Sequence, residues 1–187
     1  NRELAVAGRA SRFETLSSKT IVEDKGEQPE QVLQSHLRTV TGLAELGDIE
    51  TGKSERISVA VIDSGIADHP DLWQLSNPGV SRVLAHLDFT GSDSGKYDDF
   101  GHGTHVAGIV GGNGSISRQG DDRPLTGVAP LARLIDLRVL DDTGTGELDG
   151  LLKALSWVAA NAGQYNIRVV NLSVGTAPGE SHEDDPL

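Results

Sequence analysis

Short apolar runs alternate with polar segments through the middle of the chain. Three of these runs are residues 57–62 (ISVAVI), 82–89 (RVLAHLDF) and 132–140 (ARLIDLRVL). The first is nearly continuous in β-branched and apolar residues, a pattern typical of a strand buried on both faces of a sheet. Residues 167–172 (IRVVNL) form another run rich in β-branched residues. The pattern predicts a strand at each of the four runs.

Apolar residues also repeat at helical spacing in two longer stretches. Between residues 147 and 162 they recur every three or four positions, and Gly163 follows at the place of a C-cap glycine. Residues 29–47 predict a second amphipathic helix, which ends near Gly47. Strand, helix and strand in this order imply right-handed crossovers and a parallel sheet. The predicted fold class is α/β, a parallel β-sheet with helices on both faces, and its chemistry belongs at the carboxyl ends of the strands.

These elements divide the chain near residue 48. Residues 1–28 mix charges with small residues and show no sustained period, so no element is predicted there. Residues 48–56 (DIETGKSER) are polar and contain Gly52, as expected of a connection before the first core strand. We therefore expect an N-terminal extension with one helix at 1–47 and a further domain at 48–187.

Composition and charge narrow the classes of partner. The 187 residues include 16 Lys and Arg against 28 Asp and Glu, a formal net charge of -12 with a pI near 4.8. This balance argues against binding nucleic acid or anionic lipid through a basic surface. The longest apolar runs are only a few residues, far short of the roughly 18 that a membrane span needs. Cysteine is absent, which excludes disulfides, thiolate metal sites and a cysteine nucleophile.

A carboxylate and a histidine are the first candidates for chemistry. Asp63 directly follows the first apolar run, in VIDSGI, where it could orient a catalytic base or simply cap the turn through backbone N–H groups. His102 lies in GHGTHVAGIVGG, a segment whose small residues follow at helical spacing. At a helix N-terminus the dipole disfavours an imidazolium, whereas a facing carboxylate favours it. These opposed influences suit a general base.

The same histidine segment allows two other interpretations. His102 and His105 are three residues apart and could share a metal ion. An aspartate would complete such a site: Asp98, Asp99 or Asp63. HxxH without a helical Glu lacks the usual signature of a hydrolytic metal site. A dinucleotide site fails on spacing, because Val106 stands where the third glycine of the fingerprint belongs.

Five motifs, taken in order, resemble the subtilisin-like serine peptidases, the subtilases. They are VIDSGI, HPDL at 69–72, GHGTHVAG, GVAP at 127–130 and NLSVG at 171–175. The similarity runs from about residue 57 to residue 175. It implies the N-terminal part of a subtilase catalytic domain, with a subtilisin-like parallel sheet that is incomplete at the C-terminus. Residues 48–187 would be this partial domain.

The resemblance also implies roles for particular residues. Asp63 matches the triad aspartate and His102 the general base, which makes His105 a packing residue. Two segments match the strands on either side of a bound peptide: Gly144, Thr145, Gly146 and Ser173, Val174, Gly175. Between them a protein or peptide substrate would bind in extended conformation, through main-chain hydrogen bonds. From the residues alone, 144–146 is equally well a plain glycine-rich loop.

The implied reaction is peptide hydrolysis by an Asp/His/Ser triad through an acyl-enzyme. In the family the nucleophile lies in a GTSxA-type motif well after NLSVG, with an oxyanion asparagine between them, and neither is present in the 187 residues. Four serines could be considered as substitutes, and none stands in a nucleophile context: Ser64, Ser115, Ser117 and Ser173. We expect this chain alone to be inactive and its parent protein to be a serine endopeptidase. The alternative is a non-catalytic domain that binds peptides or a partner on a subtilase scaffold.

Cofactor and location follow from the same resemblance. The chemistry requires no cofactor. Many subtilases hold structural calcium in the loop after the GHGTH helix, with an aspartate matching Asp71 among the ligands, and the longer loop at 113–126 with Asp121 and Asp122 leaves calcium open here. Most of the family is secreted and some members are intracellular. An acidic chain without cysteine suits both, and secretion is the expectation.

Overall fold

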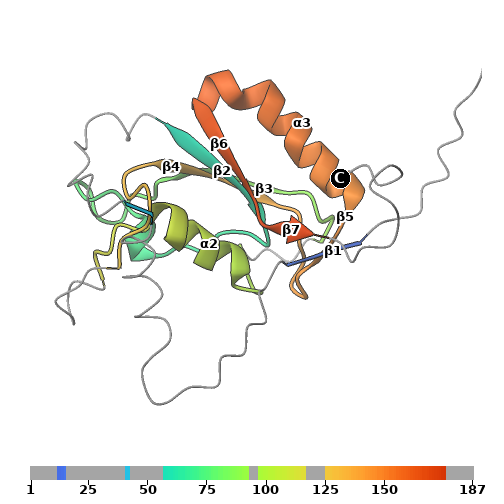
Figure 1. Ribbon diagram of the computed structural model, residues 1–187, viewed down its shortest axis with the longest axis horizontal. Coiled ribbons are helices and arrows are strands. Elements are labelled where there is room, and N and C mark those ends of the chain that lie inside the picture. The colour runs from blue at the N-terminus through green and yellow to red at the C-terminus, as the bar shows by residue number, and fades with distance from the viewer. Residues whose placement is uncertain (1–11, 16–40, 43–56, 93–96, 117–124, 176–187) are drawn as a thin grey trace, which may run out of the picture.

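A parallel four-stranded sheet forms the centre of the computed structural model, which describes residues 12–15, 41–42, 57–92, 97–116 and 125–175 (Figure 1). The strand order is β3-β4-β2-β6, and every neighbouring pair is parallel. The four strands are β2 (Ser58–Asp63), β3 (Val83–Asp88), β4 (Arg133–Arg138) and β6 (Ile167–Leu172). Each lies in one of the four apolar runs, so the predicted strands are confirmed.

One helix packs on each face of this sheet. Helix α2 (His102–Gly111) covers one face and helix α3 (Leu148–Tyr165) the other (Figure 1). Because side chains alternate along a strand, the two faces bury different residues. Beneath α3 lie Ala60, Ile62, Ile135 and Leu137, and beneath α2 lie Val59, Val61 and Leu134. The α/β fold class with helices on both faces is therefore confirmed.

Strand β2 is buried along its whole length because β4 and β6 flank it and a helix covers each face. Its last residue is Asp63, which is fully buried. The Asp63 carbonyl accepts hydrogen bonds from the N–H groups of Val139 and Leu140, at 2.8 and 3.2 Å. A buried central strand thus carries a carboxylate to the carboxyl edge of the sheet and fixes the backbone there.

Helix α3 runs past the glycine that was expected to end it. Gly163 lies inside the helix, which continues to Tyr165. Asn166 then takes the left-handed conformation, with φ 51°, and its N–H donates to the carbonyl of Ala162. Asparagine tolerates this conformation better than most residues, so the C-cap lies three positions later than predicted. Across the described residues, no helix is long and apolar enough to cross a membrane.

The N-terminal region differs from the sequence prediction. Thr41 and Gly42 form a turn in which Gly42 has a φ of 71°, so the predicted helix at 29–47 does not run through Gly42. The rest of that helix lies outside the described residues. Strand β1 (Arg12–Thr15) lies within residues 1–28, where no element was predicted. It pairs antiparallel with β5 (Thr145–Glu147) on one side and with β7 (Val174–Gly175) on the other.

Candidate active site

The end of β2 and the start of α2 bring a carboxylate and an imidazole together. Oδ1 of Asp63 lies 2.7 Å from Nδ1 of His102 and also accepts the N–H of Ser64 at 2.7 Å. The Asp63 side chain is fully buried, whereas that of His102 is 17% exposed. The ring nitrogen that does not face Asp63 is Nε2. The pair therefore joins a shielded carboxylate to a histidine that reaches the surface.

A second carboxylate, Asp98, holds the first turn of α2 against the residue that follows Asp63. The N-cap Gly101 has no side chain, and Asp98 instead accepts the N–H groups of Gly101 and Thr104, each at 2.8 Å. The Ser64 hydroxyl donates to Asp98 at 2.8 Å and accepts the N–H of Gly103 at 2.9 Å. Asp98 and Ser64 thus join the segment that carries His102 to the segment that carries Asp63.

Two glycines allow this close approach. A Cβ on Gly103 would lie 2.1 Å from the carbonyl oxygen of Gly65 and 3.1 Å from the Cβ of Asp63. Gly65 itself has a φ of 117°, and a Cβ there would lie 1.6 Å from the carbonyl oxygen of Tyr97. Backbone atoms cannot move aside as a flexible side chain can. Glycine at 65 and 103 is therefore a condition for the distance between Asp63 and His102.

A neighbouring carboxylate–imidazole pair, Asp136 and His86, supports the loop after β2. Nδ1 of His86 lies 2.9 Å from Oδ2 of Asp136, and the same oxygen accepts the N–H of Ile66 at 3.0 Å. Burial raises the pKa of Asp136, and the hydrogen bonds from His86 and Ile66 oppose that rise only in part. The Tyr97 ring lies 4.5 Å from the His86 ring, centroid to centroid. The sequence analysis missed this pair, although a lone aspartate inside the apolar run 132–140 was a signal for it.

The two segments matched to peptide-binding strands lie on either side of β1. Residues 145–147 form β5, and 174–175 form β7, so the interpretation of 144–146 as a plain loop is wrong for all but Gly144. Gly144 has a φ of 75°, and a Cβ there would lie 2.5 Å from Cζ of Phe100. The Ser173 hydroxyl donates to Asn171 at 2.8 Å. The roles of these six residues in substrate binding stay predictions.

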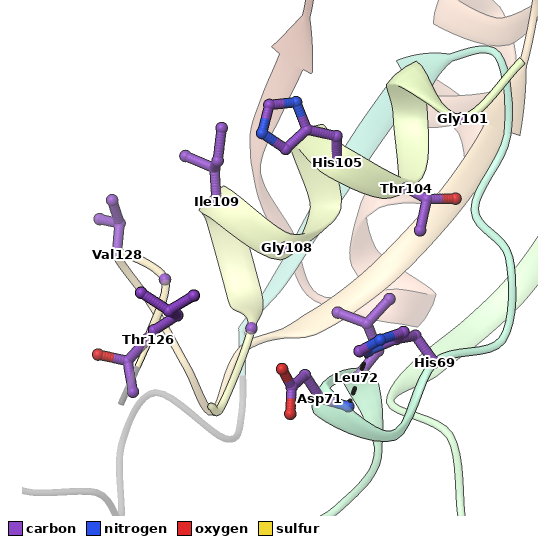
Figure 2. A pocket seen from close by; sticks show the side chains of 13 residues that line it. His69, Asp71, Leu72, Gly101, Thr104, His105, Gly108, Ile109, Thr126 and Val128 are labelled. Carbon is purple, nitrogen blue, oxygen red and sulfur yellow. Dashed lines mark hydrogen bonds between the residues drawn. The ribbon is translucent and has the colours of Figure 1, made fainter. Parts of the chain in front are cut away.

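His105 does not join His102. Its side chain is exposed instead of packed in the core, and it lines a cavity of about 400 Å³ on the outer side of α2. Figure 2 shows His105 and Ile109 on α2, with His69 and Asp71 across the cavity on the 3-10 helix η2 (Pro70–Leu72) and its N-cap. Neither Asp63 nor His102 lines this cavity. Among the described residues no three His, Asp or Glu side chains are placed to hold a metal ion.

The surroundings of Asp71 do not fit a calcium ion. Its Oδ1 accepts the Ser115 hydroxyl at 3.0 Å and the N–H of Ile116 at 2.8 Å. Its carbonyl oxygen accepts the Arg82 guanidinium at 2.9 Å, so a fixed cation already faces the residue. A calcium ion needs six to eight oxygen ligands. Asp121 and Asp122 lie outside the described residues.

Fold and site together define an α/β protein with a buried carboxylate–imidazole pair at the carboxyl edge of a parallel sheet. A family model described as the Subtilase family matches residues 54–186. The chain therefore belongs to the subtilase family, a family of serine peptidases.

Individual relatives agree with this assignment. Minor extracellular protease Epr of Bacillus subtilis is 33% identical over 174 residues, which cover 91% of this chain and 22% of that protein. Thermostable alkaline protease of Halalkalibacterium halodurans is 37% identical over 124 residues, 66% of this chain and 29% of that protein. A solved cold adapted subtilisin-like serine proteinase is 28% identical with a TM-score of 0.45, covering 60% of this chain and 35% of its own. The chain thus spans less than a third of the length of the two curated relatives.

Proposed function

We propose that this chain supplies the aspartate and the histidine of a serine endopeptidase. The observation that carries the proposal is the 2.7 Å contact between Asp63 and His102, at the carboxyl end of a buried parallel strand. Such edges are where α/β proteins gather their chemistry. Membership of the subtilase family supports the proposal, as do the names of relatives described as proteases.

In the proposed reaction a serine hydroxyl attacks the carbonyl carbon of a peptide bond while Nε2 of His102 accepts the hydroxyl proton. His102 returns this proton to the leaving amine, which leaves an acyl-enzyme, and water then releases the acid by the same steps. Asp63 accepts the Nδ1–H of His102 and stabilises the imidazolium. Because Asp63 is fully buried, water screens its charge little.

The proposal assigns the nucleophile to a serine outside the described residues. Three described serines have hydroxyls that donate to other partners: Ser64 to Asp98, Ser115 to Asp71 and Ser173 to Asn171. Loss of the serine in a subtilisin lowers kcat by about a million-fold. We therefore expect no measurable hydrolysis from this chain alone, and hydrolysis from the whole protein.

The proposed substrate is a protein or peptide in extended conformation, bound as a strand between β5 and β7. We call the space between these two strands the peptide cleft. Both strands offer main-chain groups along it, and main-chain pairing is the way extended peptides bind at sheet edges. The proposed chemistry uses no cofactor. We further propose secretion, as the name of Epr states for that relative, and an immunoblot of the culture medium tests it.

The test of the catalytic proposal uses the protein as the cell makes it, with the variant His102→Ala. We expect peptide hydrolysis to fall by about a million-fold, the loss seen when the histidine of a subtilisin is removed. Labelling of a serine by a fluorophosphonate probe should be lost as well. His105→Ala is the matched control, because this exposed histidine lies on the same helix and should leave both signals unchanged.

Two results would count against the catalytic proposal. Hydrolysis within tenfold of the wild-type rate in His102→Ala would show that another group is the base. A whole protein that binds peptides in the cleft without hydrolysing them, and that no fluorophosphonate labels, would support the alternative of a non-catalytic binding domain.

A further inference from the structure

The chain's own N-terminal region lies in the peptide cleft. Strand β1 is the central strand of the three-stranded sheet β5-β1-β7 and is antiparallel to both neighbours. Its backbone pairs Phe13 with Gly146 and Thr15 with Val174. Glu14 is paired on both sides, with Thr145 and with Gly175. Residues 12–15 therefore hold the position that the proposed function gives to a substrate.

The direction of β1 is also that of a substrate. The strand begins opposite Glu147 and advances along β5 to Thr145, so its chain direction leads toward Gly144. Gly144 contacts the Phe100 ring. The Phe100 and His102 rings are 6.5 Å apart, centroid to centroid. A peptide that enters the cleft as β1 does carries its later residues toward the imidazole.

We propose that this chain binds its own residues 12–15 in the peptide cleft, as an intramolecular competitor of external peptides. The inference rests on the proposed function for the identity of the cleft, whereas the pairing of β1 rests on the backbone alone. Main-chain pairing accepts many sequences, so a segment tethered in the same chain competes well. A short tether gives an effective concentration in the millimolar range.

Competition of this kind has a defined consequence for affinity. An external peptide binds only those molecules in which β1 has left the cleft. Its apparent Kd is therefore the intrinsic Kd divided by the fraction of open molecules. Strand β1 has four residues, so its release is a local opening that leaves the parallel sheet intact. A change that opens the cleft should tighten peptide binding without unfolding the domain.

Glu14 is the position to change. Because β1 is the central strand, the N–H of Glu14 faces either β5 or β7 and belongs to one of the two ladders. Glu14→Pro removes that donor, and proline is not tolerated in the middle of a sheet. Glu14→Ala removes the same side chain but keeps the N–H, so it is the matched control. Any difference between the two variants reports backbone pairing.

Hydrogen exchange tests the pairing directly in the full chain. We expect slowly exchanging amides within 145–147 and 174–175 in the wild type and in Glu14→Ala. In Glu14→Pro these amides should exchange at least tenfold faster, while the amides of β2 and β4 keep their protection. Absence of protected amides in the wild-type segments would overturn the inference, and so would equal exchange in the two variants. Protection that disappears on dilution of a dimer would assign β1 to a second copy and overturn it too.

Peptide binding tests the competition. The probe is a fluorescent acetylated peptide Arg-Phe-Glu-Thr amide, measured by anisotropy on proteins that also carry His102→Ala, so that it is not hydrolysed. We expect Glu14→Pro to bind it at least tenfold more tightly than the wild type or Glu14→Ala. Equal affinities for all three would overturn the competition. Faster exchange in Glu14→Pro with no peptide binding by any variant would uphold the pairing of β1 and contradict the proposed substrate cleft instead.

Discussion

At the scale of single residues, Asp63 and His102 depend on each other. Oδ2 of Asp63 is buried and has no hydrogen-bond partner, so the carboxylate is satisfied only through Oδ1. A buried charge with one partner removed is costly. The imidazole therefore stabilises the aspartate as well as being oriented by it. The same contact contributes to folding and to the proposed chemistry.

This dependence predicts energetic coupling between the two side chains. In a double-mutant cycle of Asp63→Ala and His102→Ala, we expect a coupling of about 1–3 kcal/mol in the free energy of unfolding. Urea unfolding at neutral pH measures it. His105→Ala, paired with Asp63→Ala, is the control and should couple by less than about 0.5 kcal/mol. Coupling no larger than the control would mean that the contact contributes nothing to stability.

Asp98 is predicted to act on the site through the position of α2. Asp98→Ala removes the acceptor for two backbone N–H groups and for the Ser64 hydroxyl. We expect a loss of about 2 kcal/mol in stability, as for a strong helix cap. The proton NMR signal of the His102 Nδ1–H, which lies far downfield when this proton is shared with a carboxylate, should broaden or disappear. Asp99→Ala, at the neighbouring exposed carboxylate, should change neither measurement.

Asp136 predicts a pH dependence of stability. Burial raises its pKa above the ordinary value of 3.8, against the opposing contacts of His86, while the charge of Asp98 adds to the rise. The folded state thus binds the proton more tightly than the unfolded state. The contribution of Asp136 to stability is full below pH 3.8 and is lost as the pH rises through the raised pKa. Relative to Asp136→Asn, the wild type should be more stable at pH 4 than at pH 7.

Asp141 provides a control of opposite sign for this titration. Burial alone would raise its pKa, but hydrogen bonds from Thr143 and Thr145 outweigh burial and hold the pKa below 3.8. Its contribution is present above pH 3.8 and is lost as the pH falls through the lowered pKa. Relative to Asp141→Asn, the wild type should therefore gain stability as the pH rises. Urea unfolding of both variants between pH 3 and 7 compares the two slopes, and equal slopes would contradict the assignment of either group.

At the scale of elements, one buried arginine joins three of them. Arg82 precedes β3, and its guanidinium donates to the carbonyl of Gly111 at the end of α2 and to that of Asp71 in η2. It also donates to the carbonyl of Ala132, just before β4, at 2.7 Å. Burial lowers its pKa to about 10, against the opposing charge of Asp71. The side chain thus remains a cation at neutral pH, at the negative end of the α2 dipole.

Replacement of this arginine should be costly even by lysine. The ammonium of Arg82→Lys cannot reproduce the planar fork that serves several carbonyls at once. We expect a loss of about 2–3 kcal/mol in the free energy of unfolding, in the range for buried groups left without a partner. Arg133→Lys, at an exposed arginine, should cost less than about 0.5 kcal/mol. Equal losses in the two variants would show that the guanidinium contacts do not matter.

The chelation of calcium should have no effect on this part of the fold. Arg82 already supplies positive charge beside Asp71, whose Oδ1 is occupied by protein donors. We expect the Tm to be the same with a millimolar calcium salt as with EGTA. A rise in Tm with calcium that is lost in Asp71→Ala would show that the residue is a ligand after all.

The elements that the sequence predicts well are those whose pattern is local. The four strands follow from apolar runs and α3 from its helical repeat, because burial leaves a period in the sequence itself. Strand β1 leaves no such period. Its partners lie more than 100 residues away, in β5 and β7, and strand formation depends on such partners more than on intrinsic preference. The motifs likewise indicated Asp63 and His102, but not that Asp98 and Asp136 support them, since hydrogen bonds across loops have no fixed spacing.

At the scale of the whole molecule, β6 determines how copies of this chain meet. In the sheet that the described residues form, β6 is an outer strand, and it exposes Val169 by 49%, Val170 by 40% and Leu172 by 42%. An outer strand with unpaired main-chain groups and exposed apolar side chains is a template for pairing with another chain. The net charge of -12 opposes association, but a repulsion between distant charges is screened by salt.

We therefore predict that this chain self-associates through β6, and more so as the salt concentration rises. Val169→Lys places a charge on the outer strand, the device by which natural proteins block such pairing, and it should reduce light scattering and shift sedimentation toward the monomer. Leu152→Lys is the matched control, because Leu152 is 51% exposed on α3, away from any strand edge. A wild-type chain that stays monomeric in high salt would contradict the prediction. If Leu152→Lys relieved association as well as Val169→Lys does, general apolar exposure would be the cause, because a charge on a helix leaves the main-chain groups of β6 as available as before.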